Sequence, residues 1–412
     1  MKKIIIVFFV LFFNICVSQI INIPDVNFKN FLLQARIDLN FISVPSQTNS
    51  NGFPKIDSNN DGQITVQEAL LTKRLFIPGF NITSLQGLEQ FTNLVGLQFQ
   101  FYFLQTFNFP TLTNLEELFI YNQDFGAPPP NQVLNVDLTA NTKLTTLTIT
   151  NYLTSLNINS LINLRELSIG SKTLSTLNVQ NNLKLVKLFV SAPLSSLSLT
   201  NNTKLAQVFL NGGTYSGLNF STNQNLETFE IFNSELTNLN LGTIQYIKNV
   251  NIQNTKLTSF NGANLFNLKT LNLTNNKLQT LSTKNGIIED EVLLERNPNL
   301  TTVCGDSNEL VYLQNLINLY GYLATATACE LLSNNSSSGK LMAINPNPCQ
   351  DYFKIETDEK IMSYEIYSAS GVLIQQTDQV EGSVDVSSLQ TGLYVIVVYL
   401  EKRSERMKFL KS

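Results

Sequence analysis

Residues 161–182 read LINLRELSIGSKTLSTLNVQNN, and this stretch decides the fold because its apolar residues recur in a fixed pattern. It contains the motif LxxLxΦ twice, first as LRELSI (164–169) and then about ten residues later as LSTLNV (174–179). In each copy the last two apolar residues alternate with polar ones, as in a β-strand with one buried face. One such coil is too small to bury its own apolar side, so it requires neighbours of the same kind.

The same pattern recurs at a regular period along residues 83–332. Six successive gaps between the residues that open the units are 20 or 21 residues long. Stacked coils of this kind bury their apolar edges against each other, and each coil adds about 4.8 Å of length. The sequence therefore predicts a mostly β protein, a solenoid of about ten coils with a C-terminal cap. The opening residues are Leu94, Leu115, Leu144, Leu164, Leu185, Leu205, Leu226, Ile247, Leu268 and Leu300.

Two longer gaps interrupt the period. The gap from Leu115 to Leu144 is 29 residues and contains FGAPPPNQ, and the gap from Leu268 to Leu300 is 32 residues and contains NGIIEDEVLLERNPN. Both insertions are predicted to be loops that bulge from a coil.

Asparagine closes several of the units. Asn182, Asn202 and Asn223 each lie three residues before the next opening leucine. A side-chain amide at a fixed turn position can bond the neighbouring backbone where the chain bends inward. Together with the period, these residues resemble the leucine-rich repeat, in its short bacterial form with two alternating LxxLxΦ halves. The resemblance covers about residues 83–303 and implies a scaffold that can host many kinds of partner.

Aromatic side chains recur on the predicted outer side of the first strand of each unit. Exposed rings beside polar groups suit stacking on sugars or holding an extended polypeptide. The alternative is that the rings only pack on one another and stiffen the stack, and small or amide side chains take their place in other coils. The candidate ligand-binding residues are Phe119, Tyr121, Phe189, Phe209 and Phe232.

Residues 57–68 read DSNNDGQITVQE, with oxygen-bearing side chains at positions 1, 3, 5 and 12 and glycine at position 6. Hard divalent cations prefer oxygen ligands, and this is the spacing of a calcium loop. The segment resembles an EF-hand or dockerin-type loop, and an Asp/Asn-rich turn that matches by chance is the alternative. The predicted calcium ligands are Asp57, Asn59 and Asp61 by side chain, Gln63 by its backbone carbonyl, Thr65 through water and Glu68 by two oxygens.

The setting of this loop differs from that of a paired calcium sensor. A helical pattern at residues 28–36 precedes it, but a long polar segment lies between, and no second loop follows. We predict that residues 19–82 form a small helical cap over the first coil and that calcium orders this cap. Extracellular calcium modules bind with dissociation constants as weak as about 10⁻⁴ to 10⁻³ M.

The N-terminus has the features of a secretory signal. Two lysines precede an apolar run from Ile4 to Phe13, and Cys16 and Ser18 lie at −3 and −1 of a cut before Gln19. This predicts a cleaved signal peptide at residues 1–18 and no transmembrane segment in the mature chain, with an uncleaved anchor as the alternative.

Composition excludes several functions. The chain has 27 Lys and Arg against 31 Asp and Glu, a net charge of −4, which disfavours nucleic acid as a partner. It has no histidine, which excludes histidine-based triads, bases and metal sites. The densest acidic cluster, residues 288–295, lies in a predicted loop beside one arginine, so we predict a solvated loop there and no enzyme.

The C-terminal region departs from the repeat. Residues 333–340, SNNSSSGK, are a predicted linker, and the strand-like runs of residues 341–412 predict a small β-sandwich. This tail resembles the type A sorting domain of the type IX secretion system of Bacteroidetes, through NPNP (345–348), SASGVLI (368–374), VDVSSLQTGLYVI (384–396) and KFLK (408–411). The resemblance implies passage through the type IX machinery of a Gram-negative bacterium, removal of the tail, and a place outside the cell or on its outer membrane.

Export permits disulfides, and three cysteines remain after the signal peptide. Cys304 and Cys329 bracket one compact segment and are the predicted pair, which leaves Cys349 as the odd one out. Spacing alone leaves other pairings open.

These features together predict a cell-surface or secreted binding or adhesion scaffold for a glycan or a protein. The alternative is a purely structural surface protein without a specific ligand, which would self-associate when purified.

Overall fold

The computed structural model divides into two compact units, Met1–Cys329 and Glu330–Ser412, which we describe separately. The predicted signal peptide and the predicted linker lie outside the described residues. The structure describes residues 19–35, 55–77, 81–101, 106–122, 134–150, 152–328, 342–357, 360–368, 372–378, 383–400 and 404–412.

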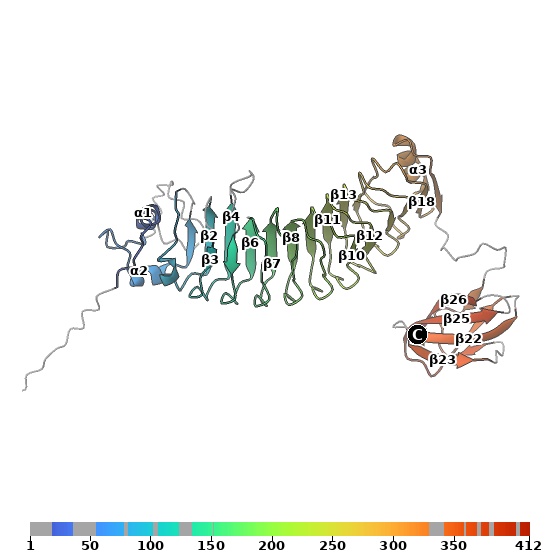
Figure 1. Cartoon of the computed structure of the whole chain (residues 1–412). Coiled ribbons are helices and arrows are strands. Elements are labelled where there is room, and N and C mark those ends of the chain that lie inside the picture. The colour runs from blue at the N-terminus through green and yellow to red at the C-terminus, as the bar shows by residue number, and fades with distance from the viewer. Residues whose placement is uncertain are drawn as a thin grey trace, which may run out of the picture. The chain divides into compact units, whose positions relative to one another are not determined.

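The first unit is a parallel β-solenoid built around one eleven-stranded sheet, here called the long sheet (Figure 1). Adjacent strands pair in register, so equivalent residues of successive coils lie side by side. The predicted leucine-rich-repeat type of solenoid is confirmed, with eleven strands rather than about ten. In order, the strands are β1 (Arg74–Ile77), β2 (Gly96–Phe101), β4 (Glu117–Asn122), β6 (Thr146–Thr150), β7 (Glu166–Gly170), β8 (Lys187–Ser191), β9 (Gln207–Asn211), β11 (Thr228–Phe232), β13 (Asn249–Gln253), β15 (Thr270–Asn272) and β17 (Glu291–Leu293).

The second LxxLxΦ copy of each unit runs back along the other side of the coil, here called the short-strand side. Its strands pair over three or four residues each and form three separate small parallel sheets. These sheets are β3 (Thr106–Asn108) with β5 (Asn135–Asp137), β10 (Gly217–Asn219) with β12 (Asn238–Asn240), and β14 (Ser259–Asn261), β16 (Thr280–Ser282), β18 (Thr302–Gly305) and β19 (Thr325–Ala328).

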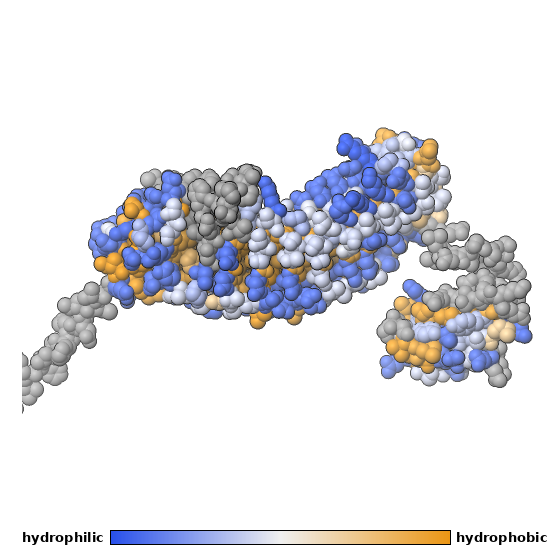
Figure 2. All heavy atoms as spheres, viewed as in Figure 1, coloured by the Kyte–Doolittle hydropathy of each residue, from blue (hydrophilic) through white to orange (hydrophobic). Residues whose placement is uncertain are grey.

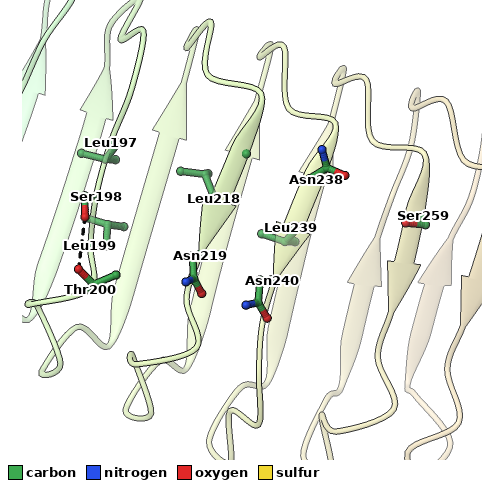
Figure 3. A pocket seen from close by; sticks show the side chains of 11 residues that line it. Leu197, Ser198, Leu199, Thr200, Leu218, Asn219, Asn238, Leu239, Asn240 and Ser259 are labelled. Carbon is green, nitrogen blue, oxygen red and sulfur yellow. Dashed lines mark hydrogen bonds between the residues drawn. The ribbon is translucent and has the colours of Figure 1, made fainter.

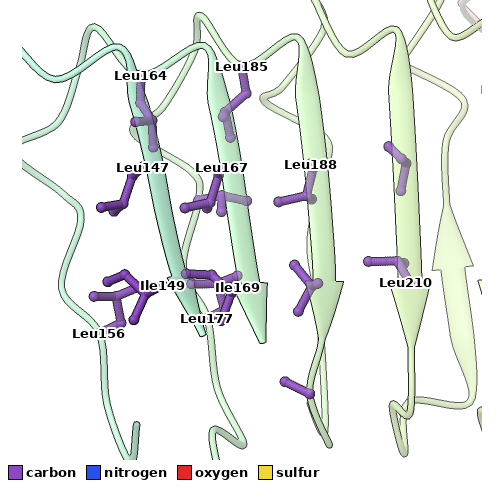
Figure 4. Packing of buried hydrophobic residues seen from close by; sticks show 14 of the residues in the cluster. Leu147, Ile149, Leu156, Leu164, Leu167, Ile169, Leu177, Leu185, Leu188 and Leu210 are labelled. Atoms are coloured by element: carbon purple, nitrogen blue, oxygen red, sulfur yellow. The ribbon is translucent and has the colours of Figure 1, made fainter. Parts of the chain in front are cut away.

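The interior between the two sides is filled by the repeated apolar residues. Leu164, Leu167 and Ile169 of one coil are buried and lie beside their equivalents in the next coil (Figure 4). One continuous buried cluster extends from Ile21 to Ala324, which joins both caps to the coils. Hydrophilic side chains cover much of the outer surface, with hydrophobic residues showing between them (Figure 2).

A column of buried asparagines links the turns. The Asn202 side-chain amide donates to the backbone oxygens of Val179 and Asn182 at 2.9 and 3.0 Å. The residue is fully buried, so these bonds satisfy carbonyl groups that water cannot reach. The interpretation of asparagine as a link between coils is confirmed. At the same turn of other coils Asn141, Asn182 and Asn223 also donate from buried amides to backbone oxygens, and Asn276 and Asn297 do so at the turn that follows the long sheet.

The second predicted loop is wrong, because residues 285–299 contain β17, the last strand of the long sheet. Glu289 lies one 21-residue period after Leu268 and occupies the opening position, where its side chain is only 3% exposed. Leu300 instead leads into β18 on the short-strand side. The period was hidden because a carboxylate stands where the pattern has leucine. The other predicted loop, around residues 125–132, lies outside the described residues.

Short helices occur at both ends of the solenoid. The N-terminal cap contains α1 (Val26–Gln34) and α2 (Val66–Leu71), and the 3₁₀ helix η1 (Leu88–Gln90) opens the next coil. At the other end α3 (Leu310–Leu319) places Leu313 and Ile317 on the apolar end of the last coils. A solenoid needs such covers because its terminal coils have no neighbour to bury their apolar faces.

The second unit consists of two antiparallel sheets around its own apolar core. Phe353, Ile366, Ile396 and Phe409 are among its buried residues. One sheet contains β20 (Ala343–Asn345), β21 (Tyr352–Glu356) and β24 (Val384–Asp385), and the other contains β23 (Leu373–Thr377), β22 (Ile361–Ser368), β25 (Gly392–Leu400) and β26 (Ser404–Lys411).

Candidate functional site

The predicted calcium loop folds as one hydrogen-bonded turn. Both carboxylate oxygens of Asp57 accept backbone N–H groups, from Asp61 and from Gly62, each at 3.2 Å. Asn59 accepts the Asp61 N–H at 3.0 Å and donates its amide to the Asp61 carboxylate at 2.8 Å. Gly62 has a φ of +77°, which an L side chain rarely adopts. The structure thus brings the first three predicted side-chain ligands together around a turn that glycine permits.

Glu68 closes the loop from its other end. It is the third residue of α2 and forms a capping box with Thr65, whose N–H and hydroxyl bond its Oε2 at 3.0 and 2.9 Å. The N–H and hydroxyl of Ser58 bond its Oε1, both at 2.9 Å. Burial by itself would raise the pKa of Glu68, but these hydrogen bonds outweigh it and lower the pKa below its ordinary value. The carboxylate is therefore held charged beside the start of the loop.

The side chains of the loop offer the oxygen ligands that a hard divalent cation prefers. The structure does not, however, place the acidic side chains as a complete metal site. Within the described residues no group of three or more Asp, Glu, His or Cys is placed to hold a metal ion. The Glu68 oxygens already accept from Ser58 and Thr65, and the Gln63 side chain accepts from Lys29 at 2.9 Å. Calcium binding by Asp57, Asn59, Asp61, Gln63, Thr65 and Glu68 stays a prediction.

The loop is anchored to the N-terminal segment of the cap. Ile64 is fully buried, and its backbone oxygen accepts the Ile21 N–H at 2.8 Å. Val66 donates to the Gln19 oxygen at 2.9 Å, so residues 19–21 pair with the loop as a short antiparallel segment. The N-terminal segment thereby supplies the backbone partner for this single loop.

Asp25 connects the cap to the solenoid, and sequence reasoning missed it. One carboxylate oxygen caps α1 through the Phe28 N–H, and the other accepts from the Thr83 N–H and hydroxyl and from the Ser84 N–H at 2.7 to 3.1 Å. Burial would raise the pKa of Asp25, but these bonds lower it. The sequence does contain a signal for this role, because Asp25 stands just before a helical apolar pattern, which is the usual place of an N-terminal helix cap.

The predicted aromatic residues lie on the outward side of the long sheet in two clusters, here called the aromatic face. Phe119 and Tyr121 on β4 stack with ring centroids 6.4 Å apart. Phe189 lies 6.4 Å from Phe209, which lies 5.5 Å from Phe232. Phe189 and Phe209 are register partners on adjacent strands. The rings therefore contact each other within each cluster, as the stiffening alternative requires.

The rings nevertheless keep accessible surface. Phe189 is 37% exposed, and the other four are partly exposed. Side chains on β6 and β7 between the two clusters are small, namely Thr148, Thr150, Ser168 and Gly170. An outward surface with exposed rings at both edges of a small polar strip has the composition of a contact surface rather than of a core.

The short-strand side carries a groove of about 430 Å³ (Figure 3). Residues 197–200, β10, β12 and Ser259 line it, and its polar groups are Asn, Ser and Thr. Asn219 and Asn240 each use their side-chain oxygen to accept a nearby backbone N–H, at 3.0 and 3.1 Å. The lining has neither an aromatic ring nor a charged group, so it offers fewer strong contacts than the aromatic face.

The structure tests only part of the cysteine predictions. Cys304 on β18 is disulfide-bonded. Its predicted partner, Cys329, lies outside the described residues. Among the described residues Cys349 is a free, buried cysteine in the second unit, where its N–H bonds the Leu410 oxygen at 2.9 Å.

Solved structures that resemble this chain are distant in sequence. They include the functional domain of InlJ from Listeria monocytogenes, with 15% identity, a TM-score of 0.33, and coverage of 85% of this chain and 93% of that one. The LRIM1/APL1C complex matches with 16% identity and a TM-score of 0.45, over 62% of this chain and 45% of that one. An internalin, InlF, from Listeria monocytogenes matches with 18% identity and a TM-score of 0.35, over 66% and 87%. No curated protein sequence matches this chain.

None of the helices in the described part of the chain is long and apolar enough to cross a membrane.

A family model matches the C-terminal tail. Residues 343–412 match the family described as the secretion system C-terminal sorting domain, and they form the two antiparallel sheets of the second unit. This match indicates export through the type IX secretion system to the cell surface or the extracellular space.

Proposed function

We propose that this protein is an exported binding scaffold whose aromatic face contacts a glycan or a protein at the cell surface, with calcium ordering the N-terminal cap. The single observation that supports binding is the set of accessible rings on successive coils, Phe189, Phe209 and Phe232, of which Phe189 and Phe209 are register partners. Few charges surround these rings, since Lys187 pairs with Glu166 at 2.9 Å and Glu230 is the register partner of Phe209. This favours ligands that are held by stacking and hydrogen bonding more than by charge. No catalytic step is part of the proposal.

Removal of two rings is expected to weaken ligand binding about tenfold. Each aromatic contact contributes about 0.5–1.5 kcal/mol beyond area burial, and 1.4 kcal/mol corresponds to a factor of ten. Retention of the full chain would be measured on cellulose, chitin and starch and on immobilised mucin and gelatin. The variant is Phe189→Ala with Phe209→Ala.

The matched control is Phe266→Ala, because this exposed phenylalanine lies on a turn away from the aromatic face. Unchanged retention of the double variant on a matrix that holds the wild type would contradict the aromatic face as the binding surface. Self-association of the wild type with no retention on any matrix would favour the purely structural alternative.

Calcium is expected to stabilise the N-terminal cap. With a dissociation constant of about 10⁻⁴ to 10⁻³ M, 10 mM calcium would add about 1.4–2.7 kcal/mol to the folded cap by mass action. Calorimetric titration and thermal melting with calcium or with EDTA would measure this effect. The support for it is the convergence of Asp57, Asn59 and Asp61 on one turn, with Glu68 beside it.

The test variant is Asp57→Asn with Asp61→Asn, and the control is Asp137→Asn, which removes an exposed acid on β5. The double variant should lose the calcium-dependent rise in melting temperature, and the control should keep it. A wild-type protein that neither binds calcium nor melts higher in its presence would exclude the calcium loop and leave the aromatic face as a separate proposal.

A further inference from the structure

Two glutamates are buried where the C-terminal cap meets the last coil. Glu289 stands just before β17, at the position that leucine occupies in other coils, and Glu309 is the residue before α3. Their side chains are 3% and 1% exposed. Carboxyl groups are rarely buried this deeply unless they are paired.

Protein donors satisfy only one oxygen of each carboxyl group. Glu289 Oε1 accepts the Asn285 amide at 2.7 Å. Glu309 Oε1 accepts the Thr283 hydroxyl at 2.5 Å and the Asp306 N–H at 2.8 Å. Oε2 of Glu289 and Oε2 of Glu309 are both buried, and neither accepts from an N–H or O–H group of the described protein. Asn285 bonds Glu289 and also donates its N–H to Asp306, whose own N–H bonds Glu309, so both glutamates belong to one buried network. The donor that each Oε2 lacks can therefore be a proton held between the two carboxyl groups.

We propose that Glu289 and Glu309 share one proton, and that this carboxyl–carboxylate pair holds α3 on the last coil and loosens as the pH rises to neutral and the proton is lost. An O–H···O⁻ bond between carboxyl groups is short and charge-assisted, which offsets part of the cost of burying one charge. Two ionised carboxylates in the same buried site would repel each other and leave both oxygens without a donor.

The surroundings of the pair disfavour double ionisation. Asp306, whose N–H bonds Glu309, brings a further negative charge to this site, and it lies on the segment that leads to α3. Its own carboxylate accepts the N–H groups of Asn285 and Gly286 at 3.0 and 2.6 Å. The other titratable side chains of the loop, the strand and the helix are Lys284, Asp290, Glu291 and Tyr312.

The backbone of β18 leaves room for this arrangement. A Cβ at Gly305 would lie 2.1 Å from Oε1 of Glu309 and 2.5 Å from Leu313. The absence of a side chain there lets the strand pass directly against the buried carboxyl group. The same contacts tie loop 283–290 to α3, so loss of the pair would loosen both segments together.

The direction of the pH effect follows from burial. Burial raises the pKa of Glu289 to about 7 and also raises the pKa of Glu309, against an ordinary value of 4.5. For an acid whose folded pKa lies above its unfolded pKa, the stabilisation is fully present below about pH 4.5. It is lost as the pH rises to about 7, because the open state releases its proton first.

Hydrogen exchange of the α3 amides in the full chain, in EDTA between pH 5 and 9, tests this proposal. After correction for intrinsic exchange rates, the opening constant of α3 should rise up to tenfold per pH unit between about pH 5 and 7 and then level off, as loss of one linked proton requires. In Glu289→Gln the amide can donate to Glu309, so the slope should disappear and α3 should stay protected at pH 8. Glu291→Gln, the same change at an exposed position two residues away, should behave as the wild type.

The pH series of hydrogen exchange on the wild-type protein tests the proposal even if Glu289→Gln folds poorly. A pH-independent opening constant in the wild type would overturn the proposal, as would an unchanged slope in a folded Glu289→Gln protein. Calcium is then added to the wild type at pH 8. Restored protection of α3 that is absent in Glu289→Gln would mean that a cation, rather than a proton, lies between the two carboxyl groups.

Discussion

Replacement of Asn202 by alanine is expected to lower the free energy of unfolding of the solenoid by about 2–4 kcal/mol. The change removes one of two donors from the backbone oxygens of Val179 and Asn182, which keep the N–H groups of Asn182 and Leu185, at about 0.5–1.5 kcal/mol for each lost hydrogen bond. It also leaves a cavity between coils. A partial offset arises because Oδ1 of Asn202 is itself buried without a donor, and alanine removes that atom. Urea denaturation followed by circular dichroism would measure the loss.

Asn201 provides the control for this prediction, because it is the adjacent asparagine and is exposed. Its amide donates to the Gln180 oxygen at 3.3 Å in reach of water, so Asn201→Ala should change stability by less than about 0.5 kcal/mol. Asn202→Leu separates volume from hydrogen bonding, since leucine fills the space without a donor. Wild-type stability in Asn202→Leu would contradict the role of the amide.

Phe229→Ala is expected to cost about 3–5 kcal/mol, the usual cost of truncating a fully buried phenylalanine. Phe229 on β11 is 0% exposed and stacks on Phe220 with centroids 5.3 Å apart. In a stack of coils this loss weakens the contacts with both neighbouring coils, because each coil is stabilised mainly by the next ones. The measurement is again the urea unfolding curve, with attention to any early partial transition around β11.

Phe232→Ala on the same strand is the matched comparison, because its ring is only partly buried and lies on the aromatic face. We expect a loss below about 1.5 kcal/mol, from its contact with Phe209. A loss as large as that of Phe229→Ala would indicate that the aromatic rings mainly stiffen the stack, and would weaken the proposed binding role.

Much of the fold was predictable because its core is repetitive. The positions of Leu164, Leu167 and Ile169 recur with a 20- or 21-residue period, and each is buried at its place in the coil. Many copies make such a pattern robust even where single residues deviate. The prediction of a loop was wrong at Glu289, where a carboxylate replaces the leucine that opens a unit. A sequence pattern cannot show that such a carboxylate is buried.

The candidate sites were less predictable. Spacing identified Asp57, Asn59 and Asp61, and the structure draws them into one turn. It also directs Glu68 to Ser58 and Thr65, which no spacing could show. The alternation of side chains placed Phe189 and Phe209 outward, but their mutual contact depends on the register of two strands.

By itself, the sequence determined the repeating solenoid and the sorting tail, because both are set by residue patterns that are local or strictly periodic. Only the tertiary structure decided that Asp25 holds the cap to Thr83 and Ser84, and that Glu289 and Glu309 are both buried near the C-terminal cap. These contacts join residues of different elements. Their chemistry depends on burial and on the neighbouring donors, which exist only once the chain has folded.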